Sequence, residues 1–309
     1  MMTKGLNDID AVLQQLRKHQ YLAERSLATA IFLCLRLNRP LFIEGEPGVG
    51  KTAVAQAMAS ILKVPLIRLQ CYEGIDRESA LYEWNYPKQL LAIRMHEIGK
   101  NGRADNLEEH SVYEEKFLLK RPLYEALRPN GPAPVLLIDE IDRSDDEFEA
   151  FLLETLSDFQ ISIPEIGTIK AEQKPFVVLT SNRTRDVHDA LKRRCLYHWL
   201  DYPSFERELE VVRLKVPGLD DTLRHDMVRF VQHLRKEPLD KRPGLAETLD
   251  WAQALEALVA TRLSPDVISE TLGCLLKDKE DMELLRSGQP HSSIDAILKE
   301  LGSSGPVVS

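Results

Sequence analysis

The stretch that decides the fold is Gly45-Glu46-Pro47-Gly48-Val49-Gly50-Lys51-Thr52. It fits the pattern G-x-x-x-x-G-K-[ST], and it stands between an apolar run at 41–43, typical of a buried strand, and a helical pattern at 51–62. Glycines here let main-chain N–H groups turn toward phosphate oxygens, and the helix start adds the positive end of its dipole. We therefore expect the whole stretch to bind a nucleotide, with Lys51 on its β- and γ-phosphates and the Thr52 hydroxyl on Mg²⁺. A purely structural glycine-rich turn is the alternative.

A second motif supplies two carboxylates. Val135–Ile138 is typical of a buried strand, and Asp139 and Glu140 follow it directly. Open parallel sheets bind ligands at the carboxyl ends of their strands, which is where these side chains would lie. We expect Asp139 to join Thr52 as a Mg²⁺ ligand at the cofactor, and Glu140 to orient or deprotonate the attacking water.

A third apolar run, Phe176–Leu179, leads into Thr180-Ser181-Asn182. We expect Asn182 to help Glu140 hold the water, although by itself it would be a cap or turn residue. The guanine-reading pattern N-K-x-D does not occur in the sequence, so ATP is favoured over GTP.

The wider pattern predicts an α/β fold with a mainly parallel sheet between helices, followed by an all-α domain. Apolar runs typical of strands stand at 41–43, 65–69, 135–138, 176–179 and 196–200, with helical patterns between them at 51–62 and 147–159. Ser144 and Glu147 form a capping-box pattern at the second of these helices. Further helical patterns stand at 9–37, broken near His19-Gln20, and then at 205–215, 220–236, 245–262, 265–277 and 292–301. The predicted organisation is a core at 1–203 that includes helices 9–37, a helical domain at 204–301 and a flexible tail at 302–309.

Composition narrows the function classes. The 309 residues are 43% hydrophobic and 29% charged, which is typical of a globular protein. The net charge of −9 argues against a protein that coats nucleic acid. No apolar run reaches the ~18 residues of a membrane helix, and the first residues lack the apolar core of a signal peptide, so we expect a cytoplasmic protein. The four cysteines lack the spacing of a zinc site or a disulfide framework.

These motifs, followed in the same order by Asp189-Ala190-Leu191-Lys192-Arg193-Arg194, resemble the AAA+ superfamily and within it the MoxR branch. The resemblance covers about residues 20–245. It implies a P-loop AAA+ core with a C-terminal lid, working as a Mg²⁺-dependent ATPase in a ring, expected to be a hexamer. It also implies that Arg194, or alternatively Arg193, is an arginine finger that acts on the nucleotide of the neighbouring subunit. Without the resemblance, this segment would be a basic turn in contact with solvent.

Two segments carry the resemblance further, and one departs from it. Residues 71–93 are the candidate helix insert of the MoxR branch, and 156–169 alternate like its hairpin before the strand at 176–179. The family has an arginine directly after a proline at the start of a lid helix, whereas this chain has Gly244 after Pro243. We expect Arg242 to take over nucleotide binding there.

The narrowest resemblance is to the MoxR-type ATPases of carbon monoxide dehydrogenase gene clusters. Tyr72-Glu73-Gly74, Tyr82-Glu83-Trp84-Asn85-Tyr86 and the segments 137–159 and 180–202 carry it. It implies a maturation chaperone that remodels a molybdenum hydroxylase client together with a von Willebrand factor A-domain protein. Two alternatives stay open, a DNA-acting AAA+ motor and the ATPase subunit of a metal chelatase. The sequence contains no recognisable nucleic-acid-binding domain and no cluster of metal ligands.

Overall fold

The computed structural model describes residues 5–99, 113–164, 166–286 and 293–303. The chain divides into two compact units. The first holds the residues up to Glu44 together with Thr52–Trp199, and the second holds Gly45–Lys51 together with the residues from Leu200 onward. Residues Gly45–Lys51 of the phosphate loop are therefore grouped with the helical region, whereas Thr52 belongs to the first unit.

The first unit is built on a five-stranded sheet with the strand order β2-β5-β8-β1-β9. Neighbouring strands from β2 to β1 pair in parallel, as in Leu41 opposite Val178 and Leu137 opposite Val178 on the two sides of β8. The strands are β1 (Leu41–Gly45), β2 (Leu66–Gln70), β5 (Val135–Asp139), β8 (Phe176–Ser181) and β9 (Leu196–Leu200). The predicted α/β fold is confirmed, and each of the five predicted strands is present.

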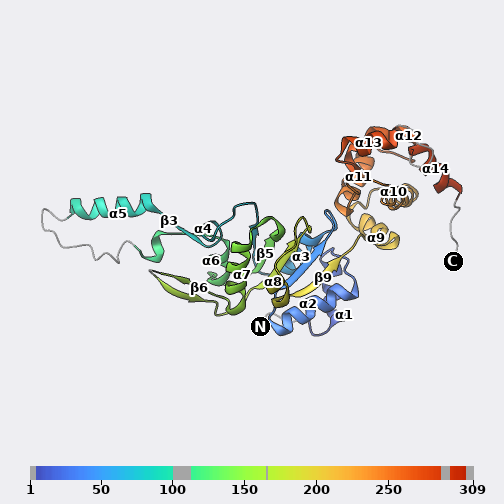
Figure 1. Cartoon of the computed structure of the whole chain (residues 1–309). Helices are drawn as coiled ribbons and strands as arrows, with labels where there is room; N and C mark the ends of the chain where they lie inside the picture. The colour runs from blue at the N-terminus through green and yellow to red at the C-terminus, as the bar shows by residue number, and fades with distance from the viewer. Residues whose placement is uncertain (1–4, 100–112, 165, 287–292, 304–309) are drawn as a thin grey trace. The chain divides into compact units, whose positions relative to one another are not determined.

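Helices flank this sheet, and Figure 1 shows α7 and α8 beside β5 and β8. The elements from the N-terminus to α8 are α1 (Ile9–Lys18), α2 (Arg25–Leu37), α3 (Lys51–Leu62), α4 (Arg77–Ala80), α5 (Tyr86–Gly99), α6 (Pro122–Leu127), α7 (Asp146–Asp158) and α8 (Asp189–Arg194), with short 3₁₀ turns η2 (Glu115–Phe117) and η3 (Ile141–Arg143). The predicted break between the first two helices is present, because Gln20 has a φ of 59° and ends the regular turn of α1.

Both faces of the central strands are buried, which explains why the strands are continuous apolar runs in the sequence. Leu136 and Leu179 share one core cluster with Phe148 and Leu152 of α7. The intervening residues, such as Leu137, are equally inaccessible to solvent. Burying each large apolar side chain contributes about 1.5–3 kcal/mol. The apolar face of α7 is therefore what fixes this helix against the sheet.

The start of α7 differs from the prediction by one residue. The carboxylate of Asp145 accepts a hydrogen bond from the Phe148 amide at 2.8 Å and is the N-cap. The Ser144 hydroxyl instead donates to the carbonyl of Ile141 at 2.8 Å and ends η3. The predicted capping box of Ser144 and Glu147 was wrong, because an unforeseen 3₁₀ turn already uses the serine.

Two small antiparallel sheets are separate from the five-stranded sheet. β6 (Gln160–Ile163) pairs with β7 (Gly167–Lys170), so the predicted hairpin is present, although its first residues belong to α7. β3 (Tyr82–Trp84) pairs with β4 (Leu118–Lys120). The predicted helix insert at 71–93 is thus α4, β3 and the first part of α5 rather than a helix alone.

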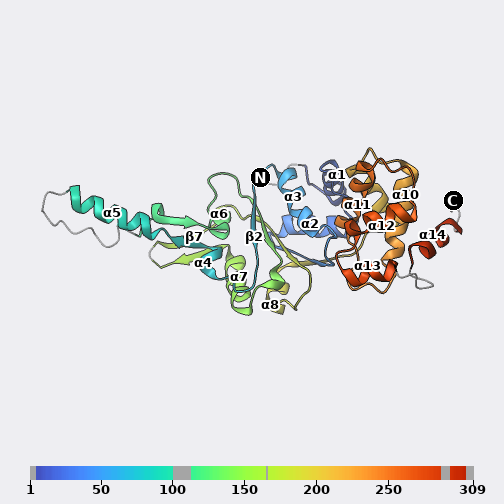
Figure 2. The ribbon, with the colours of Figure 1, turned by 90° about the horizontal axis from the view of Figure 1, so that it is seen from above.

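The second unit is helical beyond β9, and Figure 2 shows α11 and α12 side by side. Its helices are α9 (Phe205–Lys215), α10 (Asp221–Leu234), α11 (Leu245–Ala257), α12 (Pro265–Leu275), α13 (Lys279–Arg286) and α14 (Ile294–Ser303). Trp251, Phe230 and Leu272 lie at the centre of its core. The sequence did not predict α13, and the predicted tail at 302–309 lies outside the described residues from 304 onward. Within the described ranges, no helix is both long and apolar enough to cross a membrane.

Candidate nucleotide site

The phosphate loop takes the conformation that its glycines allow. Gly48 and Gly50 have φ angles of 73° and 96°, in the left-handed region where a side chain is strained. Lys51 is 7% exposed, and its ammonium group donates hydrogen bonds to the carbonyls of Gly45 at 2.8 Å and Glu46 at 2.7 Å. The loop therefore closes around its own lysine, which keeps the cation at the start of α3.

The first turn of α11 packs directly on this loop. The amide of Ala246 donates to the carbonyl of Gly48 at 3.0 Å. A Cβ added at Gly244 would lie 2.6 Å from the carbonyl oxygen of Pro47 and 2.8 Å from the Cα of Gly48. The Glu247 carboxylate caps the helix by accepting from the Gly244 amide at 2.9 Å. This close approach explains why glycine stands at position 244, since the main chains leave no room for a side chain.

Thr52 and Asp139 come together at the carboxyl ends of the strands. The Thr52 hydroxyl lies 3.2 Å from Oδ1 and 3.4 Å from Oδ2 of Asp139, whose side chain is buried. The Thr180 hydroxyl donates to Oδ1 of the same carboxylate. A hydroxyl and a carboxylate are hard oxygen donors that fit Mg²⁺, which usually takes only one or two protein carboxylates and completes its shell with water and phosphate. No cluster of three or more acidic, His or Cys ligands occurs among the described residues.

Glu140 stands in an unusual backbone conformation. Its φ of 56° and ψ of 49° are left-handed, and its amide donates to the Thr180 hydroxyl at 3.0 Å. The carboxylate is partly exposed and is held by the Gln70 amide at 3.0 Å and the Arg143 guanidinium at 3.1 Å. Such strained residues persist where surrounding contacts over-determine them, and they cluster at functional sites. The backbone turn aims Glu140 away from the strand direction that Asp139 continues.

Two residues of β2 that the sequence analysis did not identify contact these carboxylates. Arg68 donates to Oδ2 of Asp139 from Nε at 2.9 Å and from Nη2 at 2.6 Å, and Gln70 contacts Glu140. They are two residues apart and so point to the same side of the strand. Polar residues at that spacing inside an otherwise apolar strand were the available signal.

Asp142 fixes the segment that carries Asn182. Asp142 is 2% exposed, and its carboxylate accepts from the main-chain N–H of Asn182 at 3.2 Å and from the main-chain N–H and the hydroxyl of Thr184 at 2.8 Å and 2.7 Å. A buried carboxylate with several N–H and O–H donors is a strong anchor. The structure thus ties Asn182, at the end of β8, to the turn that follows Glu140. Asp142, which stands two residues after Glu140, was not predicted from the sequence.

Arg193 and Arg194 end α8, and both are exposed. Nη1 of Arg194 donates to the Ser157 hydroxyl at 2.6 Å within the same chain. Arg39 holds the main chain beneath them, with Nη2 at 2.5 Å from the Arg193 carbonyl and Nε at 3.1 Å from the Arg194 carbonyl. The two exposed guanidinium groups therefore lie at a helix end whose main chain is held by Arg39.

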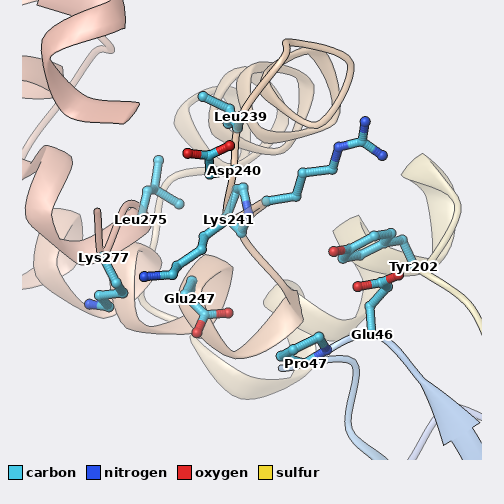
Figure 3. A pocket seen from close by; sticks show the side chains of 11 residues that line it. Glu46, Pro47, Tyr202, Leu239, Asp240, Lys241, Glu247, Leu275 and Lys277 are labelled. Atoms are coloured by element: carbon cyan, nitrogen blue, oxygen red, sulfur yellow. The ribbon is translucent and has the colours of Figure 1, made fainter. Parts of the chain in front are cut away.

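A cavity of about 410 Å³ lies inside the second unit, between the phosphate loop and the loop before α11. Figure 3 shows Tyr202 and Glu46 together on one side and Lys241 and Lys277 on the other. Burial, and next the charge of Glu46, raise the pKa of the Tyr202 phenol. The residues that line the cavity are Glu46, Pro47, Tyr202, Leu239, Asp240, Lys241, Arg242, Pro243, Glu247, Leu275 and Lys277. Arg242, predicted from the sequence, is thus part of the same cavity as the first residues of the phosphate loop.

A buried ion pair supports this cavity from behind. The Arg235 guanidinium forms two hydrogen bonds with the Glu208 carboxylate at 2.6 and 2.7 Å, and both side chains are almost inaccessible. Nε of Arg235 also donates to the Pro243 carbonyl at 2.8 Å, and the guanidinium stacks over the Tyr202 ring at 4.9 Å. One cation therefore positions two walls of the cavity.

The chain is similar to several known proteins. An uncharacterized protein of Staphylococcus haemolyticus is 22% identical over 281 residues, or 87% of this chain and 97% of that protein. The gas vesicle ATPase GvpN of Haloferax mediterranei is 24% identical over 255 residues, or 76% of this chain and 69% of GvpN. A structure of the Holliday junction branch migration motor RuvB of Thermotoga maritima has a TM-score of 0.45 at 17% identity, covering 97% of this chain and 86% of RuvB.

A family model matches residues 41–199, which is more than half of the 309 residues. The matched segment begins with β1 and therefore includes the phosphate loop, both carboxylates at the end of β5, Asn182 and the end of α8. The chain belongs to the ATPase family associated with various cellular activities, the AAA family.

Proposed function

We propose that this AAA ATPase hydrolyses ATP with Mg²⁺ as a subunit of a ring and uses the cycle to remodel a protein client. The observation that carries the hydrolytic part is the meeting of the Thr52 hydroxyl with the buried Asp139 carboxylate, next to a strained Glu140. A hydroxyl, a metal-binding carboxylate and a second, partly exposed carboxylate are what phosphoryl transfer to water requires.

Each predicted residue has a role in this proposal. The loop amides and Lys51 bind the phosphates, and Thr52 and Asp139 hold Mg²⁺, which when bound would neutralise charge on the β- and γ-phosphates. Glu140 takes a proton from the attacking water. The water oxygen then forms a bond to the γ-phosphorus while the bond between the γ-phosphorus and the ADP oxygen breaks. Asn182 helps to hold that water.

The cavity inside the second unit is proposed to take the base and ribose of ATP. Tyr202 offers an aromatic ring and Arg242 a cation, while Pro47 belongs to the phosphate loop itself. Residues 204–301 would then act as the lid over the nucleotide, as in the MoxR branch that the sequence resembles. Because α11 packs on Gly48, changes at the phosphates would reach the lid through main-chain contacts.

The ring and the client complete the proposal. We infer an assembly, expected to be a hexamer, in which Arg194 or Arg193 serves the neighbouring subunit's nucleotide. The resemblance to MoxR-type ATPases of carbon monoxide dehydrogenase gene clusters supports a molybdenum hydroxylase as the client and a von Willebrand factor A-domain protein as the partner. The protein would thus be a cytoplasmic maturation chaperone for a metalloenzyme.

Capture by a trapped variant tests this function. Glu140→Gln should bind ATP without hydrolysing it and hold its partners, so tagged protein is isolated from its native host with ATP, after nuclease treatment. Enrichment of an A-domain protein or a molybdenum hydroxylase with ATP, and not with ADP, is the expected result. Lys51→Ala, which should not bind nucleotide, is the matched control. Recovery of nucleic acid alone would contradict the chaperone function.

A further inference from the structure

Arg68 is a cation that already binds the carboxylate assigned to Mg²⁺. It lies on β2, the strand next to β5, in parallel register with Leu137. Both Nε and Nη2 donate to Oδ2 of Asp139, at 2.9 and 2.6 Å. The guanidinium also contacts Oε1 of Gln70, so its position is fixed from a second side.

Both oxygens of Asp139 are thereby in use. Oδ1 accepts from the Thr180 hydroxyl, and the Thr52 hydroxyl lies within 3.4 Å of either oxygen. Only Arg68 brings a full positive charge to this carboxylate among its described hydrogen-bond partners, and an arginine stays charged over the whole accessible pH range. The side chain of Asp139 is 4% exposed and that of Arg68 is 53% exposed, so the carboxylate is shielded from water while its counter-charge is not.

This arrangement weakens the carboxylate as a ligand for a dication. Mg²⁺ would share the single negative charge of Asp139 with the guanidinium and would be repelled by it at close range. Solvent around the exposed arginine screens this repulsion, which limits the effect to a modest factor. Mg²⁺ held less firmly would dissociate from Asp139 more easily.

We propose that Arg68 sets how strongly Asp139 holds Mg²⁺, by competing with the ion for Oδ2. It is a positioning residue that acts through Asp139. The inference rests on the proposed function, because it requires that Mg²⁺ and ATP bind at this site. It predicts that removing the charge of Arg68 makes nucleotide binding depend more on Mg²⁺.

The test measures affinity rather than turnover. A fluorescent ATP analogue is titrated with the Glu140→Gln protein, once with excess EDTA and once with saturating Mg²⁺. The dissociation constant in EDTA divided by that in Mg²⁺ gives the contribution of the metal to binding. Arg68→Gln should increase this ratio on the order of tenfold. Arg68→Lys, which keeps the charge, should stay near the parent value. Arg121→Gln is the matched control, since Arg121 forms a half-exposed ion pair with Glu83 at 2.7 Å on β3.

The outcomes separate the two proposals. An unchanged or smaller ratio for Arg68→Gln, in protein that unfolds at the parent temperature, would overturn the role of Arg68 while leaving the ATPase function intact. An increase as large in Arg68→Lys as in Arg68→Gln would also overturn it, because charge would not be the cause. Failure of the parent protein to bind the analogue in either condition would overturn both.

Discussion

Gly244 at the start of α11 lies so close to Pro47 of the phosphate loop that an added Cβ would lie 2.6 Å from the Pro47 carbonyl oxygen. The φ of Gly244 is −82°, which any residue adopts, so the glycine is required by the neighbouring backbone and not by its own conformation. Glycine at position 244 is therefore a requirement of packing.

Gly244→Ala should destabilise the protein by about 1–3 kcal/mol and lower its affinity for ATP, because the loop or the helix must move apart. Denaturant unfolding and nucleotide titration measure the two effects. Gly273→Ala is the control. It lies inside α12 with open space around its added Cβ, so alanine there should stabilise the protein by about 0.5–1 kcal/mol. Equal behaviour of the two variants would contradict the close approach.

Arg194→Ala should lower the rate of ATP hydrolysis by about 10³–10⁵-fold and spare ATP binding, if the arginine acts on the neighbouring subunit. Mixing it with Lys51→Ala should recover part of the activity, since each variant supplies the group that the other lacks. Arg193→Ala, tested in parallel, decides between the two arginines. Ser157→Ala removes only the internal partner of Arg194, at 2.6 Å, and should leave the rate nearly unchanged. No recovery in any mixture would count against a shared site.

Arg235→Met should destabilise the protein by about 3–5 kcal/mol, because it leaves the Glu208 carboxylate buried without its cation. It should also weaken nucleotide binding, through loss of the contacts to Tyr202 and Pro243. Arg213→Met, which breaks an exposed pair with Asp221, should change the stability by less than about 1 kcal/mol. Equilibrium unfolding in urea compares the two, and a similar loss in both would refute the distinction.

One cysteine should react rapidly in the native protein. Burial, the largest cause in each case, raises the pKa of Cys34, Cys71 and Cys195 to about 12, and their side chains are at most 5% exposed. Cys274 is only partly buried. A thiol reagent at pH 8 should therefore modify Cys274 first and the other three on unfolding. Cys274→Ser should abolish the fast phase, and a fast phase that persists would contradict the burial.

The same thiols give the stability a defined dependence on pH. Their pKa values are higher in the folded protein than the ordinary value near 9, so folding favours the neutral form. This contribution is complete below pH 9 and is lost as the pH rises toward 12. The free energy of unfolding should fall over that interval, and by less in Cys195→Ala when each variant is referred to its own value at pH 7. An equal fall would mean that other groups dominate.

The sequence predicted most of the regular structure because buried parallel strands and long amphipathic helices leave local patterns. α3, α9 and β9 have the predicted limits, and the other four strands of the main sheet differ by one or two residues at their ends. What was missed depends on partners far away in the chain. β3 is three residues long and pairs with a strand more than thirty residues later, and Asp145 became a cap only because η3 had taken Ser144.

The same limit applies to the candidate site. Thr52, Asp139 and Glu140 could be identified because their spacing to glycines and strands is local. Arg68 and Asp142 act across strands, through contacts that depend on which strands are neighbours, and one sequence does not give that order. The left-handed backbone of Glu140 is equally invisible beforehand, since glutamate carries no preference for it.

The packing of the phosphate loop has a consequence for dissecting the protein. Gly45 lies against Leu200, and Gly48 against Gly244, so the loop's main chain is supported by residues that come after the end of the matched family segment at 199. A fragment cut there would keep each nucleotide-binding motif and lose the surface on which the first of them rests. In a chimera of two relatives, the loop and the helical region must come from the same parent, because their main chains pack directly against each other.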